Sequence, residues 1–167
     1  MNVIQEIQTI RNKILELDTA FAELIGQLEN TNDNIIIQRL ENYETIYPLT
    51  INPAIFKGKK PTAVTVNGER IEVRTWKMVV VEIMRHCNSD AERHVALMNL
   101  RGKISGQKRV LLAKNGDEMR SPIAIAENLY IETHYDTETL LRTLTIRILD
   151  VVGYDYNKIF VSTRSIE

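Results

Sequence analysis

The side chains with the greatest capacity for metal binding or nucleophilic chemistry are three histidines and one cysteine: His86, His94, His134 and Cys87. His86 and Cys87 are adjacent, so on a helix their side chains point about 100° apart and do not reach the same tetrahedral zinc ion. His94 lies too far along the chain to restore a recognised ligand spacing. We therefore predict no metal and no cofactor, and we interpret Cys87 as a buried, inert thiol on the apolar side of a helix.

Acidic residues offer a second route to catalysis, through a divalent cation or general acid–base chemistry. Glu69, Glu72 and Arg74 follow a predicted turn, but an upstream acid that would complete a metal site is missing. Asp117 and Asp155 fall in predicted turns, where acids are common. The sequence contains no G-x-G-x-x-G or Walker phosphate-binding pattern. Because no convergent set of catalytic groups emerges, we predict that the protein is not an enzyme.

Basic residues are the most conspicuous chemical feature. The stretch FKGKKPTAVTVNGERIEVRTWK, residues 56–77, carries four lysines and two arginines around an Asn-Gly turn, and a second basic stretch begins at Arg101. Lysine and arginine neutralise phosphates without reading base sequence, so we predict contact with nucleic acid or with a nucleoprotein complex. The predicted binding residues are Lys57, Lys59, Lys60, Arg101, Lys103, Lys108, Arg109, Lys114 and Arg120.

The charge distribution separates the chain into an acidic and a basic part. Residues 1–47 carry three basic and eight acidic side chains, a net charge of −5, whereas the remaining residues have a net charge of +4. That basic excess is modest for a dedicated DNA-binding protein. It is therefore also compatible with ordinary solvated loop charges, or with lysines that contact an acidic groove of a partner protein.

Composition places the chain among soluble, globular proteins. Of 167 residues, 44% are hydrophobic and 26% are charged, values that are ordinary for a folded domain. No apolar run approaches the roughly 20 residues of a membrane span, and the N-terminus lacks the apolar core of a signal peptide. A single cysteine excludes an internal disulfide. We therefore predict a cytoplasmic protein without membrane contact.

Residues 1–47 are predicted to form a helical arm. Their apolar residues recur at alternating spacings of four and three, which is a heptad pattern. In a parallel homodimer, Glu6 would face Arg11 of the second copy and Lys13 would face Asp18, two attractive pairs. We therefore predict a homodimer through this helix. The predicted oligomerisation seam begins near Val3 and comprises Ile7, Ile10, Ile14, Leu17, Phe21, Leu24 and Leu28.

The same arm also fits packing within one chain. Ile4 and Ile25 widen the apolar stripe, as a helix that packs onto its own domain requires. After the turn ENTNDN, helical spacing resumes out of phase with the first seam, which predicts a second helix with Ile36, Leu40, Tyr43 and Tyr47 on its apolar face. The alternatives are thus an oligomeric coiled coil and an intramolecular helical hairpin.

The rest of the chain is predicted to be a linker and a compact basic module of α+β class. Residues 48–61 contain three prolines, which disfavour helix and indicate an extended linker. Residues 62–167 begin with the hairpin pattern AVTV-NG-ERIEV, whose Asn67-Gly68 pair suits a type I′ turn. Further antiparallel strands are predicted at 108–113, 128–134 and 158–163.

Capping residues predict the helices of this module. Thr75 can cap a helix whose apolar face includes Trp76, Val79, Val80, Ile83, Met84 and Cys87. Ser89 and Glu92 form a capping-box pattern at the start of a second helix. Asp136 can cap a third helix, which ends at Gly153 and is predicted to bury Leu141, Leu144, Ile148 and Val151. The alternation of hairpin, helices, strands, helix and strand is not a βαβ repeat and indicates an α+β domain.

Residues 56–161 resemble a small C-terminal module of bacterial and phage proteins. The segments that carry the resemblance are TAVTVNGERIEVRTWKMVVVEIM, GQKRVLLAKNGDEMRSP and LYIETHYDTETLLRTLTIRILDVVGYD. In relatives, the module follows restriction- or defence-associated regions or simple helical segments. Asn88–Ile104 departs from that pattern. The resemblance implies a setting in defence or restriction systems and supplies no catalytic residues.

Together, these features predict a non-enzymatic binding protein whose basic module contacts nucleic acid or a nucleoprotein complex. A small phage or mobile-element inhibitor of a bacterial defence nuclease, of anti-CRISPR type, fits the resemblance and the size of the chain. The alternative is a protein-interaction or scaffold module that uses its acidic arm, or an accessory domain of a restriction system.

Overall fold

The computed structural model describes residues 3–29, 44–104 and 109–165, and it describes the side chains of the first helix as far as residue 23. The chain divides into two units, Met1–Tyr43 and Glu44–Glu167. Helix α1, Val3–Glu29, belongs to the first unit, and every other described helix and strand belongs to the second. Among the described residues, no helix is both long and apolar enough to cross a membrane.

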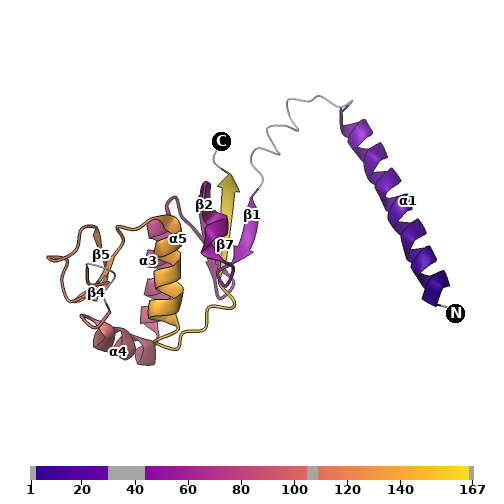
Figure 1. Ribbon diagram of the computed structural model, residues 1–167. Coiled ribbons are helices and arrows are strands. Elements are labelled where there is room, and N and C mark those ends of the chain that lie inside the picture. The colour runs from indigo at the N-terminus through magenta and orange to yellow at the C-terminus, as the bar shows by residue number, and fades with distance from the viewer. Residues whose placement is uncertain (1–2, 30–43, 105–108, 166–167) are drawn as a thin grey trace. The chain divides into compact units, whose positions relative to one another are not determined.

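A four-stranded antiparallel sheet forms one layer of the second unit (Figure 1). Its strands are β1 (Thr45–Pro48), β2 (Lys59–Val66), β3 (Glu69–Glu72) and β7 (Phe160–Ser165). They are arranged in the order β1-β7-β2-β3, so the last strand of the chain is inserted between β1 and β2. A short 3₁₀ helix, η1 (Pro53–Phe56), lies between β1 and β2 in the chain.

The predicted hairpin is confirmed by β2 and β3. Val64 pairs with Ile71 across the two strands, and Asn67 and Gly68 connect them. Both turn residues have positive φ, 51° and 85°, which is the backbone conformation that an Asn-Gly pair tolerates in a type I′ turn. The tight turn fixes the register, so residues that alternate along the hairpin face opposite sides of the sheet.

A smaller antiparallel sheet forms a second layer. It contains β4 (Leu112–Ala113), β5 (Pro122–Ala126) and β6 (Leu129–Glu132), in the order β4-β6-β5. The predicted strands at 108–113 and 128–134 are thus confirmed in part, over shorter ranges. Strand β5 was not among the predicted strands; it begins at Pro122, a residue that is tolerated at the start of an edge strand.

The helices of the second unit begin where capping residues predict, with one exception. Thr75 caps α3 (Trp76–Ser89), and its Oγ1 accepts a hydrogen bond from Met78 N at 3.2 Å. Asp136 caps α5 (Thr137–Arg142) in the same way. The predicted capping box that starts at Ser89 is wrong.

Helix α4 (Ala91–Leu100) begins one residue later than that capping box requires. Asp90 is its N-cap, and Asp90 Oδ1 accepts a hydrogen bond from Arg93 N at 2.9 Å. Ser89 is still part of α3, where its hydroxyl donates to the carbonyl of His86. A carboxylate next to a serine accepts the N–H bond of the first turn more strongly, and it therefore determines where the helix starts.

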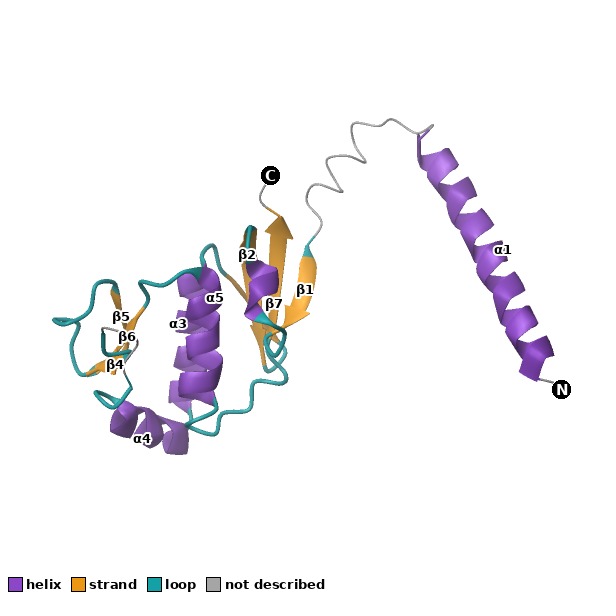
Figure 2. Ribbon diagram, viewed as in Figure 1, coloured by secondary structure: helices purple, strands orange, loops and turns teal. Residues whose placement is uncertain are grey.

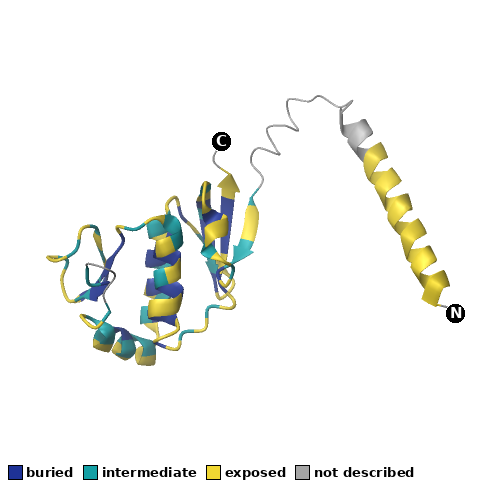
Figure 3. Cartoon of the chain, in the orientation of Figure 1, coloured by how far each residue is buried: buried dark blue, intermediate teal, exposed yellow. Residues whose placement is uncertain are grey.

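Helices α3 and α5 lie between the two sheets (Figures 1 and 2), and α3 contacts both β2 and β5. The predicted apolar face of α3 is buried against these layers (Figure 3), with Val79, Val80, Ile83, Met84 and Cys87 fully enclosed. The second unit is an α+β domain, as the sequence predicts.

The last helix departs from the predicted periodicity because it widens into a π-helix. After α5, the segment η2 (Thr143–Leu149) is π-helical, and Asp150 N donates to the carbonyl of Thr145, five residues earlier. One extra residue in a turn rotates everything that follows by about 100°. Val151, which was predicted to be buried, is therefore 60% exposed, and Val152 takes the buried place.

The predicted boundaries between arm, linker and module also change. Tyr47, which was assigned to a second helix, lies in strand β1 and pairs with Val161 of β7. The predicted linker at 48–61 contains η1 and the first residues of β2. Long-range pairing with β7 stabilises β1, and no local pattern reveals that partner. The other residues of the predicted second helix, Ile36, Leu40 and Tyr43, lie outside the described residues.

Candidate functional site

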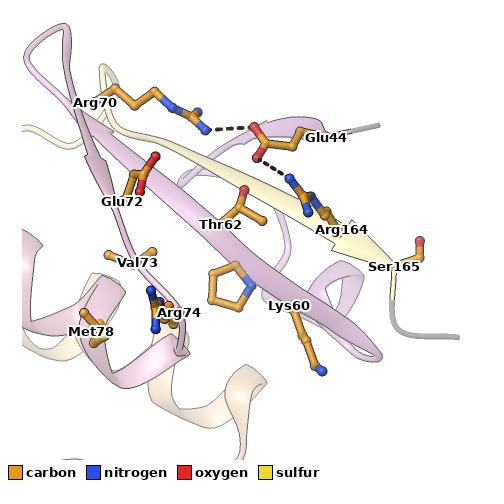
Figure 4. Close-up of a pocket in the computed structure, with 11 residues that line it drawn as sticks. Glu44, Lys60, Thr62, Arg70, Glu72, Val73, Arg74, Met78, Arg164 and Ser165 are labelled. Atoms are coloured by element: carbon orange, nitrogen blue, oxygen red, sulfur yellow. Dashed lines mark hydrogen bonds and ion pairs between the residues drawn. The ribbon is translucent and has the colours of Figure 1, made fainter. Parts of the chain in front are cut away.

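A polar concavity of about 700 Å³ opens at the edge of the four-stranded sheet (Figure 4). It is lined by strands β2, β3 and β7, by the residue before β1 and by the start of α3. Four of its side chains are cationic and two are carboxylates. We call this site the basic concavity, and its lining residues are Glu44, Lys60, Pro61, Thr62, Arg70, Glu72, Val73, Arg74, Met78, Arg164 and Ser165.

The register of β2 creates the space for this concavity. Strand β2 pairs with β7 along nearly its whole length, but it pairs with β3 only from Ala63 onwards. A register shift between Pro61 and Ala63 marks a β-bulge, which increases local twist and separates neighbouring strands. Past Glu72 the chain turns away towards α3, held by one hydrogen bond from Val73 N to the carbonyl of Thr62. The side of β2 at Lys60–Thr62 is left open as a result.

Glu44 organises two arginines in the concavity. Its Oε2 lies 2.9 Å from Arg70 Nη2, and its Oε1 lies 3.6 Å from Arg164 Nη2; Figure 4 shows both pairs. Arg70 also donates through Nη1 to Ser162 Oγ at 3.0 Å. These contacts join β1's flank, β3 and β7 and hold Arg70 in one orientation, in which its guanidinium is half-exposed.

The carboxylate of Glu44 is favoured in its charged form. The Thr62 hydroxyl lowers the pKa of Glu44, partial burial opposes this effect, and Arg70 and Arg164 lower the pKa further. The charged form of Glu44 is therefore favoured, and its carboxylate orients both guanidinium groups. Each of these ion pairs is exposed enough for solvent to weaken it, so their role is mainly to orient the side chains.

Lys60 and Arg74 supply cationic groups without such partners. Both side chains are exposed, and neither forms an ion pair with any residue that the structure describes. Met78, which is 42% exposed, lies with them at the concavity. An anionic ligand could reach these two cations without displacing an internal carboxylate, which lowers the cost of binding.

The three lysines of the first predicted basic cluster, Lys57, Lys59 and Lys60, lie in different surroundings. Lys60 lines the basic concavity. Lys59 Nζ lies 5.9 Å from the centre of the Tyr47 ring, in a cation–π contact, and its carbonyl accepts a hydrogen bond from Trp76 Nε1 at 3.0 Å. Lys57 is exposed at the end of η1. Only one of these three lysines therefore belongs to the concavity.

The described members of the second predicted cluster belong to the smaller sheet and its connections, and this sheet lies on the other side of α3 and α5 from β2 (Figure 1). Arg101 has a structural role, because its guanidinium donates to the carbonyls of Met98 at 2.9 Å and Asn128 at 2.7 Å. Arg109 is half-buried, and Lys108 lies outside the described residues. The remaining members are exposed: Lys103, Lys114 and Arg120.

Three arginines of the concavity, Arg70, Arg74 and Arg164, are absent from the predicted binding set. Arg70 and Glu72 alternate along β3, so the hairpin pattern alone places them on one face of the sheet. Lys60 is paired with Arg164 in the register of β2 and β7. That pairing joins residues from opposite ends of the module, and short-range sequence patterns carry no signal for it.

The histidines and the cysteine do not converge on a site. Within the described residues, no three His, Cys, Asp or Glu side chains are grouped so that they could hold a metal ion. His94 Nδ1 lies 2.9 Å from Asn88 Oδ1, while His134 is exposed. Cys87 is completely buried, as predicted, and burial raises the pKa of its thiol to about 12. At neutral pH, Cys87 is a thiol and not a nucleophilic thiolate.

Comparison with known proteins adds no assignment to this geometry. No protein-family model, no curated protein and no solved structure matches the chain.

Proposed function

We propose that the module Glu44–Glu167 is a non-enzymatic binding domain that holds nucleic acid at the basic concavity. The observation that carries the proposal is the convergence of Lys60, Arg70, Arg74 and Arg164 on one opening. Four cations against two carboxylates give the concavity a positive excess, although the whole chain has a net charge of −1. A local field of this kind attracts phosphates irrespective of the net charge of the protein.

The four cations differ in how firmly they are held, and this difference suits backbone recognition. Glu44 and Ser162 orient Arg70, so its planar guanidinium is prepared to bind a phosphate with two parallel hydrogen bonds. Lys60 and Arg74 line the same concavity as exposed cations that form no ion pair with a described residue. Contacts of both kinds fix the position of a strand without reading its bases. A cytoplasmic location, where the Cys87 thiol stays reduced, fits this function.

Fluorescence anisotropy of labelled DNA, titrated with the protein, tests the proposal. A single strand and a duplex of about 20 nucleotides are titrated at about 50 mM and about 200 mM salt. The expected result is binding whose log K falls with log salt, by about 0.9 for each phosphate contact on a duplex. No binding of either probe at the lower salt concentration would contradict the proposal.

Two charge-reversal variants locate the contact. Lys60→Glu combined with Arg74→Glu should weaken binding at least about tenfold and reduce the salt slope by about two contacts. The matched control is Lys103→Glu combined with Lys114→Glu, which introduces the same charge change at two exposed lysines next to β4 and outside the basic concavity. A loss confined to that control pair would assign nucleic-acid binding to the second predicted cluster instead.

A nucleoprotein target is a second candidate, and two exposed apolar side chains favour it. Ile46 is 62% exposed and Phe160 is 37% exposed, on β1 and β7 of the sheet that holds the concavity. A sugar–phosphate backbone does not bury an exposed isoleucine, whereas the core of a protein–protein interface does. With the resemblance to defence-associated modules, this suggests a phage-type inhibitor that engages a defence nuclease of the CRISPR or restriction kind.

A pull-down separates this candidate from plain nucleic-acid binding. The tagged protein is incubated with purified defence nuclease complexes, before and after nuclease treatment. Capture that survives the treatment and is lost in an Ile46→Asp, Phe160→Asp variant supports a protein target. Capture that disappears with the nucleic acid contradicts it and leaves the concavity as the sole contact.

A further inference from the structure

Helix α1 carries an apolar stripe that is exposed wherever the structure describes its side chains. The helix is 27 residues long, or about 40 Å. Figure 3 shows its described surface as exposed throughout. The apolar residues of the heptad seam have exposed fractions between 58% and 65%, and these residues are Val3, Ile7, Ile10, Ile14, Leu17 and Phe21. Leu24 and Leu28 complete the predicted seam, and their side chains lie outside the described residues.

A helix with such a stripe gains its stability from packing. Backbone propensity alone stabilises an isolated helix only marginally in water. Each exposed apolar side chain keeps apolar surface in contact with water, and burial of that surface against a second helix would stabilise the helix. The spacing of four and three places these residues along one side of the helix, and Ile4, which is 65% exposed, widens that side. This is the geometry of a helix that packs against another helix.

The charges that flank the seam also lack partners. Glu6, Arg11, Lys13 and Asp18 form no ion pair with any other residue in the described part of the chain. Glu6 and Arg11, like Lys13 and Asp18, are five residues apart, so they do not meet on one helix. In two parallel helices in register, this is the separation that faces across the seam.

We propose that α1 is a parallel, in-register coiled coil with α1 of a second copy of this chain. In that dimer the apolar seam of each copy covers the other. Glu6 of one helix faces Arg11 of the second, Lys13 faces Asp18, and symmetry forms each pair twice. A second copy of this chain thus matches both the apolar spacing and the charges of the seam.

The dimer would give each assembly two modules and therefore two basic concavities. Linked binding sites raise the overall affinity for a target with repeated anionic groups by about 10²- to 10⁴-fold without any new contact. This consequence rests on the proposed function, whereas the dimer itself does not. A failure of DNA binding and a failure of dimerisation are separate results, because mass is measured without any ligand.

Mass measurement of the full chain by light scattering during size-exclusion chromatography tests the dimer. The expected mass is twice the 19.2 kDa of one chain. Ile14→Asp, at the centre of the seam, should give a monomer. Asn12→Asp adds the same charge on the opposite side of the helix and should leave the dimer intact. A monomeric wild-type chain, or a dimer that Ile14→Asp does not affect, would overturn the proposal.

Charge reversal tests the pairing without removing an apolar side chain. Lys13→Glu places two acids in opposition and should raise the dimer dissociation constant about three- to tenfold. Adding Asp18→Lys to the same chain restores an attractive pair and should restore the affinity. Recovery in the double variant cannot come from within one helix, because these residues are five positions apart. No recovery would contradict the parallel register.

A single introduced thiol tests the orientation. Val3→Cys places thiols side by side at one end of a parallel dimer, whereas in an antiparallel dimer they lie more than about 30 Å apart. Native Cys87 is buried and does not compete for oxidation. Rapid formation of a disulfide-linked dimer is expected, and a dimer by mass that does not cross-link would refute the parallel arrangement.

Discussion

At the scale of single residues, the most constrained charge is Glu132. Its side chain is only 1% exposed, and it lies within strand β6 of the smaller sheet. Backbone N–H groups surround it: Arg120 N donates to Oε2 at 2.6 Å, and Ser121 N and His134 N donate to Oε1 at 3.0 and 2.9 Å. Burial alone would raise the pKa of Glu132, but these hydrogen bonds outweigh burial and lower it. Glu132 therefore stabilises the loop that precedes β5 as an ionised group.

Replacing Glu132 by glutamine should destabilise the protein in a pH-dependent way. The amide offers one acceptor oxygen to several donors, and we expect a loss of about 2–3 kcal/mol in the free energy of unfolding at pH 7. Because the folded pKa is below the unfolded value near 4.5, the advantage of wild type is complete above that pH. It should shrink as pH falls through the folded pKa. Urea unfolding of both proteins between pH 3 and 7 measures this, and a difference independent of pH would contradict it.

Cys87 should be unreactive in the folded protein. With a pKa of about 12, only about one thiol in ten thousand is ionised at pH 8, and the side chain is fully buried. We expect no modification by a disulfide reagent such as DTNB over an hour in native buffer, and rapid modification of one thiol in denaturant. Rapid labelling without denaturant would mean that α3 opens locally.

At the scale of elements, turns and caps determine where helices and strands begin and end. Asn67-Gly68, Thr75 and Asp136 each act on the residues immediately next to them, and the sequence predicted all three correctly. The prediction failed where a distant segment decides the structure. Strand β1 forms because β7 pairs with it. The π-helix at Thr143–Leu149 breaks the helical spacing of apolar residues, and no cap or turn residue in the sequence predicts it. Lys60 was predicted as a site residue, whereas Arg164 joins it only through strand pairing.

Replacing Gly68 or Gly116 by alanine should reduce the stability by different amounts, because different physical constraints require glycine at the two positions. At Gly68, φ is +85° and an added Cβ would meet no atom within 4 Å, so Gly68→Ala should cost only the conformational penalty of about 1 kcal/mol. At Gly116, an added Cβ would lie 2.7 Å from Cβ of Pro122. Gly116→Ala should therefore cost more, about 2–3 kcal/mol, because the loop must move away from β5. Chemical unfolding of both variants compares the two losses, and equal values would refute the distinction.

At the scale of the whole molecule, the division into two units has a direct consequence for stability. Every buried apolar residue in the described ranges belongs to the unit Glu44–Glu167. A fragment of residues 44–167 should fold alone and melt within about 3 °C of the full chain, which corresponds to less than about 1 kcal/mol. Thermal unfolding followed by circular dichroism measures this. A markedly lower melting temperature would show that the arm contributes to the core.

The edges of the larger sheet have a bearing on solubility. Strands β1 and β3 form its two edges, and each is only four residues long. Strand β1 ends at Pro48, which has no N–H group to offer, and β3 displays the charges of Glu69, Arg70 and Glu72. In the dimer proposed above, the link between the two modules raises the effective concentration of each module near the other. Short, charged or proline-terminated edges resist strand-to-strand pairing at that concentration, so the tethered modules can stay separate and avoid aggregation.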